Sequence, residues 1–382
     1  MFISDNLGVN ENGNLTIGGC DAAGLAREYG TPLYVMDENK IRESCRAFMG
    51  AVRENCAPGS LPAYASKAFC CKEMCRIVAS EGLALDVASG GELYTALSAG
   101  FPAERIFFHG NNKSEAELRY ALESGVGRIV ADNLRELRLI SRIGGETGRT
   151  GAVMLRLKPG VEAHTHEFIM TGQIDSKFGI AIETGEAYEA AKLASVLPNV
   201  ELTGLHCHIG SQIFELEPFA LAARVMLEFI ARLKDELGIY VRELNLGGGF
   251  GIRYRDSDTP KPYGDFLKTV SGAVSDLCGS FELDVPRIYI EPGRSIAGTA
   301  GVTLYTVGEI KEIPGIRTYV SIDGGMNDNP RYALYKAPYD AVIANKASRE
   351  REKTVTIAGQ CCESGDLIQE NIRIQAPASG DI

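Results

Sequence analysis

The chain has 382 residues, 45% of them hydrophobic, which is enough for a large core and more than one domain. Its formal net charge is -11, which argues against nucleic acid as a partner because phosphate binding needs a basic face. The N-terminus shows no secretory pattern and no stretch is apolar enough to span a bilayer, so we expect a cytoplasmic protein without a membrane partner.

In chain order, the first 35 residues read as short strands with turns, and eight short apolar runs follow. Amphipathic helical patterns, such as 91–99, 114–124 and 134–143, fill most of the gaps between the runs. The runs are 61–66, 84–87, 105–108, 128–130, 152–157, 202–206, 243–246 and 287–290. This alternation is typical of a parallel sheet, and eight units predict an α/β fold with a closed (β/α)8 TIM barrel over residues 36–296.

The pattern changes after the eighth run. Segments 302–307, 318–322 and 354–357 read as strands without helices between them. We therefore predict a second, mostly antiparallel β domain, a sandwich or small barrel, built from both chain ends (1–35 and 297–382).

Polar, charged or glycine residues stand in or directly after each predicted barrel strand. They are Lys67, Asp86, Ser89, His109, Asn111, Asp132, Arg156, His208, Gly247, Gly248, Gly249, Glu291 and Arg294. In such barrels the C-terminal ends of the strands meet at one mouth, where the chemistry takes place. Eight strands that all end in this way predict a functional site at that mouth.

Six segments that include these residues resemble the barrel-type pyridoxal phosphate (PLP) decarboxylases, the family that acts on ornithine, arginine and diaminopimelate. They are YASK at 64–67, DVAS at 86–89, HCHIGSQ at 206–212, GGGFG at 247–251, EPGR at 291–294 and CESGD at 362–366. Each segment is moderately specific, whereas their order and spacing together are very specific. The resemblance runs from the first barrel strand nearly to the end of the chain.

The resemblance implies that Lys67 holds PLP as a Schiff base, since the chemistry needs a primary amine that the substrate amine can displace. Glu291 is expected to pair with the pyridine nitrogen, and His208 to stack on the ring.

Metal binding is the rival interpretation of His206 and His208, because residues two apart on a strand face the same way. No histidine follows His208 and no paired C-x-x-C spacing is present among the ten cysteines, so we predict no metal site.

The phosphate of the cofactor is expected at the glycine run, because glycines let backbone N–H groups approach anionic oxygens. The residues implied are Ser211, Gly248, Gly249 and Gly293, while Arg294 binds phosphate, substrate carboxylate or both. Asp86 and Arg156 are expected to support Lys67 and Glu291. Segment 160–177, with His164 and His166, is either a lid or an ordinary surface loop.

The substrate is expected from segment 326–335, MNDNPRYALY, which resembles the diaminopimelate-specific branch of the family. Arg331 and Tyr335 would bind the distal carboxylate with help from Arg294, and Glu363 would bind the distal ammonium. Cys362 matches a cysteine that enters the partner subunit's site and can deliver a proton, which implies a homodimer with shared sites. The implied reaction converts meso-diaminopimelate to L-lysine and CO2.

Three alternatives remain open. One is another enzyme on the same scaffold, such as an arginine, ornithine or carboxynorspermidine decarboxylase or a racemase, although Arg331 and Tyr335 argue against a simple cationic substrate. The others are a non-catalytic homologue and a PLP-handling protein without turnover. Lys67 and Cys362 are both present, which favours an enzyme.

Family members continue beyond the position of Ile382 with a Gly-Ala-Tyr segment that reaches the cofactor, so we expect weaker cofactor binding if this chain stops there.

Overall fold

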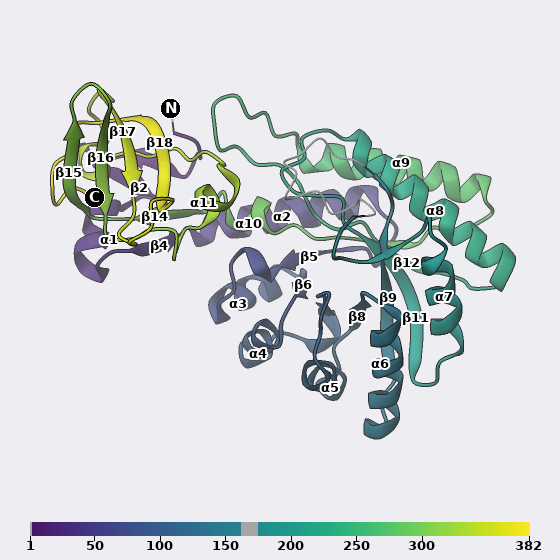
Figure 1. Ribbon diagram of the computed structural model, residues 1–382. Coiled ribbons are helices and arrows are strands. Elements are labelled where there is room, and N and C mark those ends of the chain that lie inside the picture. Colours follow the sequence, from purple (N-terminus) through teal and green to yellow (C-terminus); the bar gives the residue numbers. More distant parts are fainter. Residues whose placement is uncertain (1, 162–174) are drawn as a thin grey trace. The chain divides into compact units, whose positions relative to one another are not determined.

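The computed structural model describes residues 2–161 and 175–382, which form two compact units (Figure 1). One unit comprises residues 42–251 and 260–298, and the other comprises residues 1–41, 252–259 and 299–382. The domain boundaries expected from the sequence, at 35/36 and 296/297, remain predictions. Most of segment 160–177, with His164 and His166, lies outside the described residues.

Parallel strands of the first unit close into a ring, in the order β5-β6-β7-β8-β9-β11-β12-β13 and back to β5. Their bounds are β5 Leu61–Ala65, β6 Ala84–Val87, β7 Ile106–Phe108, β8 Arg128–Ala131, β9 Gly151–Lys158, β11 Val200–Cys207, β12 Glu243–Asn245 and β13 Arg287–Ile290. A further short strand, β10 (Ile180–Ala181), pairs with β9. The eight predicted runs match these strands to within two residues at each end, and the barrel is confirmed.

Helices lie between the strands, and several begin at a side chain that caps them. Ser89, Ser114 and Asn133 each accept a backbone N–H three residues on, and Ser114 forms a capping box with Glu117. The helices are α2 Glu38–Asn55, α3 Lys72–Ser80, α4 Gly90–Ser98, α5 Glu115–Glu123, α6 Leu134–Thr147, α7 Glu186–Val196, α8 Glu217–Leu237, α9 Tyr263–Ser280 and α10 Arg294–Ala297. Ser89 and Asn133 stand two residues after the ends of β6 and β8, so α4 and α6 begin close to the mouth of the barrel.

The barrel interior is filled from the strands themselves. Its buried cluster contains Ala63, Ala84, Phe107, Val130, Met154 and Tyr289. At the N-terminal ends of the strands, the fully buried Glu243 binds Arg128 through two contacts of 2.6 and 2.7 Å and Arg287 through one of 2.7 Å. These charges close the end of the barrel opposite the predicted site.

The second unit is mostly antiparallel, as predicted, with one parallel pair between β16 and β17. Its elements are β1 Leu7–Val9, β2 Leu15–Ile17, β3 Cys20–Asp21, α1 Ala22–Tyr29, β4 Leu33–Met36, β14 Gly301–Leu304, β15 Val307–Ile313, β16 Arg317–Ile322, α11 Arg331–Tyr335, β17 Lys353–Ala358 and β18 Leu367–Ile374. The single strand expected at 302–307 is instead the end of one strand and the start of another. β14 pairs with β4 and β15 with β16, a change of partner that apolar periodicity cannot reveal.

No helix within the described residues is long and apolar enough to cross a membrane.

Candidate active site

Lys67 lies directly after β5, in a short 3-10 helix over Ser66–Ala68. The buried Tyr64 donates from its hydroxyl to the Phe69 carbonyl (2.9 Å), and the Ala65 N–H donates to the Pro292 carbonyl (3.0 Å). These bonds fix the backbone on either side of the lysine and tie it to the segment after β13. The Lys67 side chain is exposed, and its positive charge acts on both Asp86 and His208.

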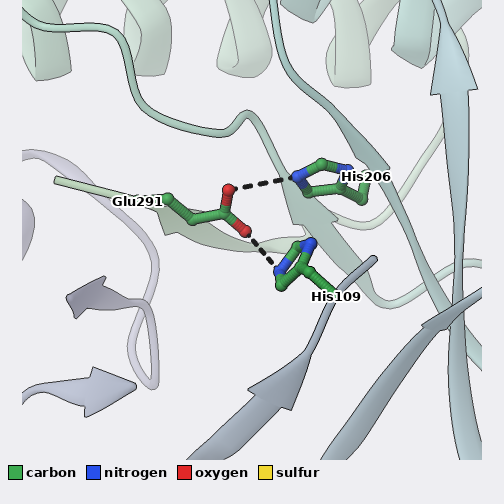
Figure 2. Close-up of side chains that lie close together, drawn as sticks. All are labelled: His109, His206 and Glu291. Carbon is green, nitrogen blue, oxygen red and sulfur yellow. Dashed lines mark hydrogen bonds and ion pairs between the residues drawn. The ribbon is translucent and has the colours of Figure 1, made fainter. Parts of the chain in front are cut away.

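Glu291, directly after β13, is a buried carboxylate that side chains from the ends of three other strands contact, and Figure 2 shows two of these side chains, His109 and His206. Its Oε1 lies 2.8 Å from His109 Nε2, and its Oε2 lies 3.2 Å from His206 Nε2. Asn245 Nδ2 donates to Oε1 at 2.7 Å. The residues belong to the ends of β7, β11, β12 and β13, and only closure of the barrel brings them together.

The Glu291 carboxyl group is ionised at neutral pH. Burial alone would raise its pKa, but His109 and His206 outweigh burial and hold the pKa well below its usual value. Burial lowers the pKa of His206 to about 4, so this ring is neutral at pH 7 and its Nε2–H can donate to Glu291. Burial also raises the pKa of Asp86 to about 6, and its Oδ1 lies 3.7 Å from His109 Nε2.

His208 follows β11 and faces the glycine turn. The Gly248 N–H donates to His208 Nδ1 (3.2 Å), which leaves the proton of a neutral ring on Nε2. Burial, with Lys67 and Arg156 nearby, lowers the pKa of His208 well below its usual value, so the ring is neutral. Gly248 must be glycine, because a Cβ there would lie 2.1 Å from the Glu291 carbonyl oxygen.

The histidines of the H-x-H pair therefore have different partners. His206 faces Glu291, and His208 faces the glycine turn. The group of metal-type donors that the described residues contain is His109, His206 and Glu291, whose ligand atoms lie within 4.8 Å of one another. In this group Glu291 contacts both rings, at 2.8 Å from His109 and 3.2 Å from His206.

Two arginines complete the mouth of the barrel. Arg294 Nε and Nη2 donate to Ser211 Oγ at 3.3 and 3.2 Å. Arg156 is partly buried, with its guanidinium 4.4 Å from the Phe178 ring centroid and its Nε 4.0 Å from Asp132 Oδ1. Asp132 also accepts from the Gly179 N–H (3.0 Å), so Arg156 is held between a ring and a fixed carboxylate.

Every residue predicted for the cofactor lies at this end of the barrel unit, whereas the other predicted residues lie in the β unit. The cofactor set is Lys67, Asp86, Arg156, His208, Ser211, Gly248, Gly249, Glu291, Gly293 and Arg294. In the β unit, Arg331 and Tyr335 are the first and last residues of α11, and Cys362 and Glu363 are exposed between β17 and β18. Arg331 stacks over Tyr254, with its Cζ 3.9 Å from the ring centroid. The roles of all these residues remain predictions.

Sequence reasoning assigned no role to His109 and Asn245 and considered His206 only in the rival metal-binding interpretation. His109 had a signal, since it ends the third predicted strand. Asn245 had a weaker one, since it stands two residues before the glycine turn, but nothing local shows that its side chain meets Glu291.

The donor set fits pyridoxal phosphate. A carboxylate has about four acceptor positions; the hydrogen bonds from His206 and Asn245 use two of them and His109 lies close to a third, so a position remains for a protonated ring nitrogen. Lys67 supplies the amine and His208 a flat neutral ring. Arg294 with Ser211 and the glycine turn offers donors of the kind that bind phosphate.

Comparison with known proteins agrees with this chemistry. The family described as pyridoxal-dependent decarboxylase, pyridoxal binding domain, matches residues 38–298. Diaminopimelate decarboxylase of Bacillus subtilis (strain 168) is 49% identical over 382 residues, 100% of this chain and 87% of that protein. Its counterpart from Bacillus methanolicus is also 49% identical, over 100% of this chain and 88% of the relative. The crystal structure of diaminopimelate decarboxylase from M. jannaschii in co-complex with L-lysine has a TM-score of 0.88 and 35% identity, and covers 100% of this chain and 87% of that one.

Proposed function

Because this chain belongs to the pyridoxal-dependent decarboxylases, we propose that it releases CO2 from meso-diaminopimelate and forms L-lysine, with pyridoxal phosphate as its cofactor. The observation that carries this proposal is the 49% identity to diaminopimelate decarboxylase over the whole chain. The similar M. jannaschii enzyme was crystallised with L-lysine, the product expected here. The reaction is therefore the last step of lysine biosynthesis.

The cofactor, when bound, supplies an electron sink for the electron pair that remains when CO2 leaves. Lys67 would hold it through its primary amine. Glu291, ionised beside His109 and His206, would accept a hydrogen bond from its protonated ring nitrogen. The neutral His208, oriented by the Gly248 N–H, would offer a flat ring against it.

The substrate's distal end requires groups of both signs. Arg331 and Tyr335 would bind the distal carboxylate together with Arg294, and Glu363 would bind the distal ammonium. Stacking of the Arg331 guanidinium on Tyr254 supports this role, because it holds the planar group in one orientation before substrate arrives. Ornithine and arginine lack the distal carboxylate, so this site would favour diaminopimelate over them.

The active form would be a homodimer in which Cys362 of each subunit enters the other subunit's site and delivers the proton to the reacting carbon. The exposure of Cys362 and Glu363 in the single chain supports this arrangement. Lys67→Ala and Cys362→Ala subunits, each inactive alone, would then complement when unfolded together and refolded as a mixture. Random pairing restores one complete site in half of the dimers, or about a quarter of wild-type activity. A mixture as inactive as its components would contradict the shared site.

All ten cysteines lie within the described residues and are free thiols, which supports the proposed cytoplasmic location.

The experiment that tests the proposed function is CO2 release by purified protein with PLP, offered meso-diaminopimelate, L-ornithine and L-arginine in parallel. We expect release from meso-diaminopimelate alone, and none from Lys67→Ala. Preference for ornithine or arginine would retain the fold and cofactor but contradict the roles of Arg331 and Tyr335. PLP binding without CO2 release from any substrate would contradict the proposal as a whole.

A further inference from the structure

Asn245 is a fully buried side chain at the end of β12 to which the family resemblance gives no role. Its Nδ2 donates to Glu291 Oε1 at 2.7 Å, and its Oδ1 accepts from the Gly247 N–H at 2.9 Å. An ionised carboxylate can only accept, and a backbone N–H can only donate. These two partners therefore set the orientation of the amide, and only a group with one donor and one acceptor satisfies both.

The contact is part of a closed ring of hydrogen bonds across the ends of β12 and β13. Gly247 donates to Asn245, Asn245 donates to Glu291, and the Glu291 N–H donates back to the Gly247 carbonyl at 2.8 Å. The next N–H of the same turn, from Gly248, donates to His208. One buried amide thus joins the carboxylate to the turn that orients His208.

We propose that Asn245 is a positioning residue that adds to the stabilisation of ionised Glu291 and fixes this carboxylate to the Gly247–Gly249 turn, so that both hold the cofactor as one unit. The inference rests on the proposed function, because Glu291 and the turn have this task only if the chain binds PLP. Hydrogen bonding to the charged form of a carboxyl group favours that form. Without the amide, Glu291 loses one such donor and the Gly247 N–H loses its acceptor.

Two substitutions separate this role from simple packing. Asn245→Ala removes the donor and the acceptor at every pH. Asn245→Asp keeps the size and the acceptor, but places a second carboxyl group within hydrogen-bond distance of Glu291. Such a pair shares one proton at low pH, where the protonated aspartic acid can still donate, and loses it as the pH rises.

The test is a titration of the cofactor-free protein with PLP, followed by absorbance and fluorescence from pH 6 to 9, with thermal unfolding of each cofactor-free variant. We expect Asn245→Ala to bind PLP about tenfold or more weakly than wild type throughout, the loss typical of a bond to a charged group. Asn245→Asp should bind nearly as wild type at the acidic end and lose about tenfold relative to wild type as the pH rises.

Ser141→Ala is the matched control, because it removes the hydrogen bond that the buried Ser141 donates to the Pro198 carbonyl (2.6 Å) in the same unit. It should lower thermal stability and leave PLP affinity unchanged. Equal PLP affinity in wild type and both Asn245 variants overturns the inference, as does a loss in Ser141→Ala in proportion to its stability. If Asn245→Ala does not fold, the pH slope of Asn245→Asp decides alone. Wild-type protein that binds PLP and releases CO2 while the variants are unaffected overturns only this inference, whereas wild-type protein that binds no PLP overturns the proposed function with it.

Discussion

Replacement of Glu243 by glutamine should destabilise the barrel without touching its chemistry. Glu243 is fully buried at the N-terminal end of β12, where it binds Arg128 twice and Arg287 once. Glutamine has the same size but no charge, so both guanidinium groups lose their counterion. Glu291, the buried carboxylate of the candidate site, lies at the other end of the barrel. In such barrels, residues at one end serve function and residues at the opposite end serve stability.

The magnitude follows from the exposure of the two arginines. Loss of one partner of a buried pair costs about 3–5 kcal/mol, whereas an exposed pair contributes about 1 kcal/mol or less. The Arg128 side chain is 20% exposed and that of Arg287 is 43% exposed, so most of the loss belongs to Arg128. Because solvent screens both in part, we expect Glu243→Gln to lower the free energy of unfolding by about 2–3 kcal/mol at pH 7.

The pH dependence provides a second signature. Burial opposes ionisation of Glu243, but Arg128 and Arg287 lower its pKa below the ordinary value. A lowered folded-state pKa stabilises above the unfolded value of about 4.3, and this contribution is lost as the pH falls through the folded-state pKa. The difference between wild type and Glu243→Gln should therefore shrink below about pH 4.

Urea unfolding of the cofactor-free protein, followed by circular dichroism at several pH values, measures both effects. Glu201→Gln is the control, because its partner Arg242 is 67% exposed and Glu201 itself 54% exposed. We expect no measurable change for this variant. A Glu243→Gln protein as stable as wild type, or one that loses PLP affinity at unchanged stability, would refute the reasoning.

Three further changes test the buried charges and caps. Asp86→Asn should stabilise the cofactor-free protein at pH 7 by on the order of 1–3 kcal/mol and not at pH 4, which thermal unfolding against pH measures. The folded-state pKa of Asp86 is raised to about 6, so ionisation destabilises the fold increasingly from the unfolded value of about 3.9 upward, and this cost is complete above about pH 6. Lys113→Met removes the ion-pair partner of the buried Glu136 (2.6 Å) and should lower the free energy of unfolding by about 3–5 kcal/mol, measured with urea. The double variant Lys113→Met/Glu136→Leu should recover much of this stability, because it leaves no buried charge without a partner. Ser114→Ala removes the capping box of α5 and should cost about 1 kcal/mol in the same assay, and an unchanged midpoint would show that the cap adds nothing.

The sequence alone determined the barrel and the positions at its mouth. Strand and helix periods are local, so apolar runs located all eight strands to within two residues, and whatever follows each run had to face the same end. Lys67 and Glu291 were identified in this way. The second unit was less predictable, because β14 and β15 follow each other almost without a break and differ only in the strands they pair with.

Only the tertiary structure decided which side chains meet at the mouth and in which protonation state. His206 and Glu291 are 85 positions apart, and Asn245 and Glu291 are 46 apart. Their contacts depend on the order in which the strands close, which no local pattern records. The pKa values follow from the same closure, since burial makes His206 neutral and the histidines around Glu291 keep it ionised. The sequence thus predicts which groups lie at the mouth of the barrel. Their hydrogen-bond partners and charges depend on barrel closure, because closure brings the side chains together and excludes water from around them.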